Sequence, residues 1–156
     1  MSRETGLVIN NLILSVILGV VFVGTLYPLF VEALSGEKLS VGGPYFNAVA
    51  GPLALILAVL VGIGPLIAWR RERRPVLKQL TIPALLGVTA LAITISLWRD
   101  MHILPSLGFM VAAYLAAASI LPLIGRNPLR APLATWGMVV AHFGIAVALL
   151  GMAANA

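Results

Sequence analysis

The sequence predicts an all-α fold, a polytopic integral membrane bundle of about five transmembrane helices. Of the 156 residues, 61% are hydrophobic and only 10% are charged, a composition that soluble globular domains do not have. The apolar residues lie in long runs, and about 20 residues at ~1.5 Å rise per residue cross the ~30 Å hydrocarbon core of a bilayer. These runs predict one transmembrane domain over residues 1–156, with spans at about 7–30, 46–69, 79–98, 103–124 and 133–152.

The segments between the runs define the connections. Residues 32–45 are rich in Ser, Gly and Pro and are too polar and broken to span. The second span carries Pro52 near its start and Pro65 near its end, and each is expected to kink the helix or to mark an unwound turn. Residues 99–102 form a very short connection, which predicts that the third and fourth spans are antiparallel neighbours.

The basic residues predict the orientation in the membrane. Alternating spans place most of the Lys and Arg side chains on one side, and Lys38 and Arg99 on the other. By the positive-inside rule the majority side is cytoplasmic, so the N-terminus is expected inside and the C-terminus outside. The same rule accounts for the net charge of +5, and no nucleic-acid partner is expected. The majority group is Arg3, Arg70, Arg71, Arg73, Arg74, Lys78, Arg126 and Arg130.

The fifth span carries His142 near its centre. An imidazole at mid-membrane depth is costly and is therefore a functional hypothesis. Five small residues fall on one stripe of this helix, on which another helix can pack closely. His142 points away from that stripe, and Ala146 one turn later leaves room for something flat. Haem ligation, a proton or ion path in a small transporter, and a hydrogen-bonded histidine in a structural scaffold all remain open. The stripe is Gly137, Ala141, Gly144, Ala148 and Gly151.

Other common chemistries have no motif here. The chain has no cysteine, which excludes thiol–disulfide exchange and iron–sulfur ligation by this chain. It also has no HExxH sequence, no phosphate-binding glycine-rich loop, no paired carboxylates and no Ser–His–Asp arrangement. His142 is the one residue that the sequence itself marks for chemistry, and no catalytic residue can be named.

Short motifs along the first two spans and in the last span carry a family resemblance. They are Arg3-Glu4-Thr5 with Asn10-Asn11, Gly24-Thr25-Leu26-Tyr27-Pro28-Leu29 with Glu32, Ser40-Val41-Gly42, Pro44-Tyr45-Phe46-Asn47, Gly62-Ile63-Gly64-Pro65-Leu66 and Ala141-His142-Phe143-Gly144. Together they resemble the CcmF-type haem lyases of cytochrome c maturation. The resemblance covers nearly the whole chain and is strongest over residues 3–70.

The resemblance implies a part in attaching haem to apocytochrome c at the outer face of the cytoplasmic (inner) membrane. Family members hold a b-type haem between two transmembrane histidines, and His142 matches the second of them, as an axial ligand of the haem iron. The tryptophan-rich outer motif of the family is absent, since Trp69, Trp98 and Trp136 are scattered. The chain thus resembles a middle-to-late portion of a longer protein, either a truncation or the product of a split gene, and is not expected to attach haem alone.

The resemblance also implies partners and an outward surface. The partners are the rest of the haem lyase with its tryptophan-rich motif and second haem ligand, apocytochrome c, and the haem chaperone and thiol-handling maturation proteins, all acting within or beside the lipid bilayer. Tyr45, Phe46 and His102 are candidates for the outward face where substrate docks. Without the resemblance, the two aromatics are interfacial belt residues and His102 is a solvated loop histidine.

Overall fold

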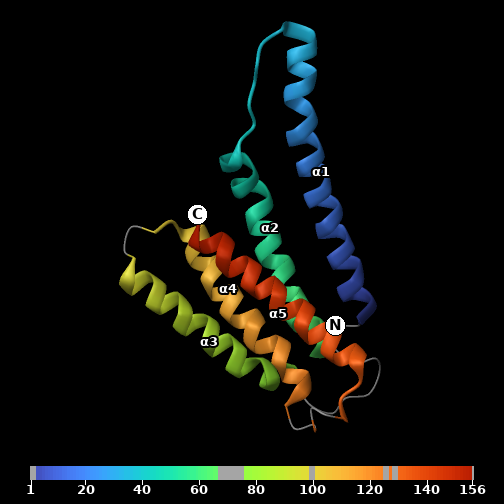
Figure 1. Cartoon of the computed structure of the whole chain (residues 1–156), viewed down its shortest axis with the longest axis vertical. Helices are drawn as coiled ribbons and strands as arrows, with labels where there is room; N and C mark the ends of the chain where they lie inside the picture. Colours follow the sequence, from blue (N-terminus) through green and yellow to red (C-terminus); the bar gives the residue numbers. More distant parts are fainter. Residues whose placement is uncertain (1–2, 67–75, 99–100, 125–126, 128–129, 156) are drawn as a thin grey trace.

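The computed structural model is an all-α bundle, as the sequence predicts (Figure 1). It describes residues 3–66, 76–98, 101–124, 127 and 130–155, and this part of the chain contains no strand. Its five α-helices are all long and apolar enough to cross a membrane. The helices are α1 (Arg3–Ser35), α2 (Gly43–Ile63), α3 (Val76–Leu97), α4 (Ile103–Ile120) and α5 (Leu133–Ala154), with 3-10 turns at Gly64–Leu66 and Leu121–Leu123.

Helix α1 is longer than the sequence predicts. It ends at Ser35 instead of near residue 30, so the expected loop over 32–45 shortens to residues 36–42. The end near residue 30 is predicted from hydropathy alone. Glu32 ends the apolar run, but glutamate favours helices, so the helix continues past it. Gly36 stops it, because its φ of +71° is the left-handed conformation that glycine adopts after a helix, and its N–H donates to the carbonyl of Glu32 at 2.9 Å.

The two prolines of the second span have different effects. Pro52 lies inside α2, which continues past it. Pro65 lies in the 3-10 turn that follows Ile63, so one of the two expected unwound turns is present. The last residues of the predicted span, including Trp69, lie outside the described residues, as does the basic cluster at 70–74.

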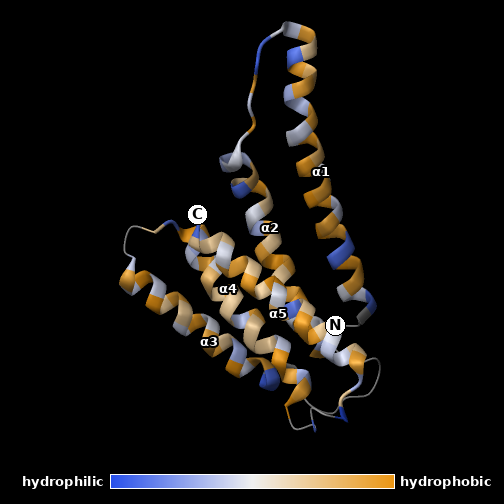
Figure 2. Cartoon of the chain, in the orientation of Figure 1, coloured by the Kyte–Doolittle hydropathy of each residue, from blue (hydrophilic) through white to orange (hydrophobic). Residues whose placement is uncertain are grey.

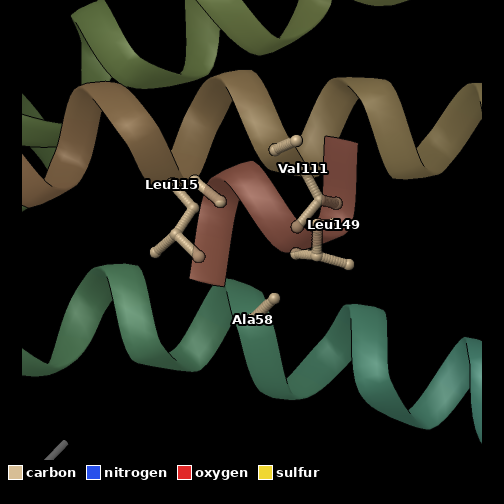
Figure 3. Close-up of a cluster of buried hydrophobic side chains, with 6 residues drawn as sticks. Ala58, Val111, Leu115 and Leu149 are labelled. Atoms are coloured by element: carbon tan, nitrogen blue, oxygen red, sulfur yellow. The ribbon is translucent and has the colours of Figure 1, made fainter. Parts of the chain in front are cut away.

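Helix α4 is the centre of the bundle. It packs against α2, α3 and α5, whereas α1 packs mainly on α2 (Figure 1). The short connection over 99–102 does make α3 and α4 neighbours, as predicted. The buried cluster joins α2, α4 and α5, and Figure 3 shows its side chains converging between those three helices. Its members are Ala58, Val111, Ala112, Leu115, Ala146 and Leu149.

Glycines allow the helices to approach one another. A Cβ on Gly62 of α2 would lie 2.7 Å from Cε1 of Tyr114 on α4, and the Tyr114 hydroxyl donates to the carbonyl of Val59 at 3.3 Å. Between α4 and α5, a Cβ on Gly108 would lie 2.9 Å from the Cβ of Ala153. Close contacts at small residues are how helices associate in lipid, where apolar burial gives little net drive.

Most large apolar side chains lie on the outside. All five helices carry exposed large apolar residues, although α4 has them only at its two ends, and Figure 2 shows that hydrophilic residues occur mainly near the helix ends. Such a surface would aggregate in water, but it matches the hydrocarbon of a bilayer. Among the described basic residues, Arg3, Lys78 and Arg130 lie at one end of the bundle and Lys38 at the other. The assignment of those ends to inside and outside stays a prediction.

Candidate functional site

His142 lies on the face of α5 that packs into the bundle. The buried residues Val139, Ala146, Leu149 and Ala153 follow the three- and four-residue spacing of one helical face, and His142 falls on it. Its side chain is half-buried. The helix therefore holds the imidazole at the boundary between the packed interior and the lipid-facing surface.

One nitrogen of the imidazole has no hydrogen-bond partner. Nδ1 of His142 is fully buried, and none of the described residues donates to it or accepts from it. A buried polar atom without a partner costs about 1–3 kcal/mol, and native structures contain few of them. The scaffold hypothesis expected a hydrogen-bonded histidine here, so this observation does not support it.

The prediction for the two faces of α5 is wrong, because the small-residue stripe faces outward and the face with His142 packs into the bundle. The small-residue stripe is exposed throughout, and a Cβ added at Gly137, Gly144 or Gly151 would meet open space. Ala146, which was expected to leave room beside the ring, is instead packed into the core cluster, with 2% of its surface exposed. The core cluster therefore fills the space next to Ala146, which leaves no room there for a flat ligand.

The residues of this chain fit one axial ligand of a haem rather than a complete site. No group of three or more His, Asp or Glu side chains suited to a metal ion occurs in the described part of the chain. His102 is not close in depth, because Met152, which lines the same cleft as His102, is ten residues and ~15 Å along α5 from His142. Because Nδ1 is enclosed by the chain, a ligand from outside the chain would have to bind the other ring nitrogen, Nε2.

A cleft of about 500 Å³ lies at the end of the bundle where α2 and α4 begin and α5 ends. It contains His102, the residue before α4, and two amides that the sequence analysis missed, Asn47 in α2 and Asn155 after α5. Figure 1 shows the C-terminus beside the start of α4 at this end. Asn155 could have been noticed as a helix-ending residue, but that it lines the same cleft as Asn47 follows only from the fold.

Tyr45 and Phe46 join α1 to α2. Their rings meet edge to face, with centroids 5.3 Å apart and planes at 80°. A Cβ on Gly24 of α1 would lie 2.8 Å from Cε1 of Tyr45 and 2.9 Å from Cε1 of Phe46. Because glycine has no side chain, the two aromatic rings can pack directly on α1 at Gly24. The structure brings His102 into the cleft with Asn47, the neighbour of Phe46, while the two rings themselves pack on α1.

The fold and the half-buried imidazole define a class, a polytopic helical membrane protein with a histidine within one of its spans. No family model and no solved structure matches the chain. It is 39% identical over 160 residues to the cytochrome c-type biogenesis protein CcmF of Pseudomonas fluorescens, covering 97% of this chain and 24% of that protein. It is 37% identical over 165 residues to the cytochrome c-type biogenesis protein CycK of Bradyrhizobium diazoefficiens, covering 97% and 25%, and 33% identical over 156 residues to CcmF of Escherichia coli, covering 97% and 24%.

The chain is thus related to a segment of the CcmF-type cytochrome c biogenesis proteins. This finding confirms the resemblance that the sequence motifs carry. The chain spans about a quarter of the length of these relatives.

Proposed function

We propose that this chain acts in cytochrome c maturation in the cytoplasmic membrane, as one part of a CcmF-like haem lyase. The proposal is supported by relatives that are named for cytochrome c biogenesis and by the membrane-spanning fold. Within that assembly, His142 is one axial ligand of a membrane b-type haem, and the remaining length of the lyase supplies the other.

The observation that carries the haem proposal is the state of the His142 ring. Nδ1 is enclosed by the chain without a partner, so we assign iron ligation to Nε2, the nitrogen on the other side of the ring. A bound b haem supplies one-electron redox chemistry. The chain's own contribution is to hold the imidazole at a fixed position on α5, between the packed interior and the lipid-facing surface.

The orientation of the bundle in the membrane determines which end faces the proposed partners. Under the positive-inside orientation, the cleft with His102 and the loop over 36–42 face outward, the side on which apocytochrome c would receive haem. The tryptophan-rich motif, the haem chaperone and the thiol-handling proteins belong to the partners of this chain. Haem attachment is an activity of the whole assembly rather than of these five helices.

A proton or ion path finds less support. Among the described residues of the five helices, acidic and basic side chains lie in or next to the terminal turns, as Glu4, Glu32 and Lys78 do. A relay through the membrane lines up several ionisable groups at depth. His142 has no such companion in the described part of the chain.

The test is the absorbance spectrum of the chain purified together with the remaining part of the lyase. We expect a low-spin b-type Soret band and α band in the wild type. His142→Ala should abolish both bands, because the iron loses an axial ligand, while His102→Ala, the matched histidine control, should keep them. Bands that survive His142→Ala, or that are absent from the wild type, would overturn the assignment.

A further inference from the structure

The cleft at the helix ends has the features of a binding site for an amphiphilic molecule. Its floor is apolar and its polar side chains lie only at the rim, where the helices begin or end. Asn47 is eight residues from Leu55 on α2, so the rim and the floor on that helix are ~12 Å apart in depth. The volume of about 500 Å³ falls within the range of small-molecule sites.

The cleft exists because α2 and α5 both pack on α4 but touch each other little. Small residues let α4 approach each of them closely. A Cβ on Gly51 of α2 would lie 3.0 Å from Cδ2 of Leu104, and Gly108 meets Ala153 of α5 at a similarly short range. The space between α2 and α5 at this end is therefore left unfilled by the chain. Ala54 of α2 also lines it.

The rim offers hydrogen-bond donors. His102 and the amides of Asn47 and Asn155 line the cleft, and no carboxylate occurs among its lining residues. The side chain of His102 does not cap α4, so the first N–H groups of that helix are not used by it. Such a rim suits an acceptor-rich anionic group such as a phosphodiester.

We propose that this cleft binds one phospholipid, with an acyl chain on the apolar floor and the phosphodiester at the rim formed by Asn47, His102 and Asn155. The bilayer around the five helices provides the ligand at high local concentration. The cleft changes from an apolar floor to a polar rim, and a phospholipid changes in the same way from its acyl chains to its headgroup. The site does not depend on haem binding and is separate from His142 in depth.

The experiment measures phospholipid retained by the full chain. The chain is extracted from membranes into dodecylmaltoside, supplied with phosphatidylglycerol and then exchanged into lipid-free detergent, and bound lipid is counted by native mass spectrometry. We expect one retained phospholipid on the wild type. Ala54→Phe, which fills the floor, should abolish retention. Ala92→Phe, on the exposed side of α3, is the matched control and should retain the lipid.

A second pair of variants tests the rim. His102→Ala combined with Asn155→Ala should weaken retention about tenfold through the loss of two hydrogen bonds, whereas Asn11→Ala on α1 should not change it. This pair decides the question if Ala54→Phe does not fold. Equal retention by all variants, no retention by the wild type, displacement by excess inorganic phosphate, or loss of the lipid when the remaining part of the lyase binds would each overturn the proposal.

Discussion

Gly62→Ala is predicted to loosen the α2–α4 contact. A Cβ at this position would lie 2.7 Å from Cε1 of Tyr114 and 2.9 Å from its hydroxyl oxygen. The ring cannot move away freely, because its hydroxyl donates to the carbonyl of Val59. Helix α3 also approaches Tyr114 closely at Gly87, where an added Cβ would lie 3.3 Å from the Cβ of Tyr114. The tyrosine is thus held between α2 and α3.

The magnitude follows from opposing terms. Overpacking costs about 1–3 kcal/mol, and a lost interhelical hydrogen bond costs about 0.6 kcal/mol in a membrane protein. Replacing glycine by alanine within a helix returns up to about 1 kcal/mol. The free energy of unfolding should therefore fall by about 1–2 kcal/mol in Gly62→Ala. In a Tyr114→Ala background the clash is gone, and the same change should be neutral or stabilising.

The assay is reversible unfolding in mixed dodecylmaltoside and dodecyl sulfate micelles, followed by helical ellipticity. Gly144→Ala is the matched control, because nothing lies within 4 Å of its added Cβ. The double-mutant cycle of Gly62→Ala with Tyr114→Ala should give a coupling energy of about 1 kcal/mol or more. The reasoning is refuted if Gly62→Ala is as stable as Gly144→Ala, or if removing the tyrosine ring gives no relief.

Three further outcomes can be measured in the same system. Leu115→Ala should lower the free energy of unfolding by about 3 kcal/mol, because Leu115 is 0% exposed, whereas Leu97→Ala at 67% exposure should have little effect; equal losses would contradict the described core. Gly24→Val should separate α1 from α2 and raise the hydrogen exchange of α1 amides, while Gly19→Val, which has open space, should not; unchanged exchange in both would count against the contact. His142→Leu should stabilise the chain in the absence of haem by about 1–3 kcal/mol, since an unpartnered Nδ1 is removed, and a loss of stability would indicate a partner for that nitrogen.

The five helices could be predicted because a membrane span needs a continuous apolar run, and such runs are visible in one sequence. Helix ends were less predictable. Ser35 ends α1 because of the conformation of Gly36, and hydropathy does not report a backbone dihedral angle. The periodicity of α5 separated His142 from the small-residue stripe correctly. Which face packs inside depends on the surface of α4, and that information is not contained in the sequence of α5.

Of the candidate sites, one could be predicted from the sequence and the other could not. His142 could be identified from depth alone, since an imidazole in the middle of an apolar run is unusual. The cleft could not be identified, because Asn47 and Asn155 are 108 residues apart in the sequence (155 minus 47) and come to line one cleft only through the packing of α2 and α5 on α4. The sequence also does not show that Gly24 leaves room for the ring of Tyr45, although both residues belong to motifs that carry the family resemblance.

The length of α1 has a consequence for the surrounding bilayer. Its two carboxylates, Glu4 and Glu32, are 28 residues apart (32 minus 4) and therefore ~42 Å apart along a straight helix. A bilayer including its headgroup layers is about 40–45 Å thick, so an upright α1 keeps both charges at opposite headgroup layers. Strong tilting would draw one of them into hydrocarbon. The two carboxylates thus limit the tilt of α1 and set a maximum for the local hydrocarbon thickness, because a thicker core would bury one of them.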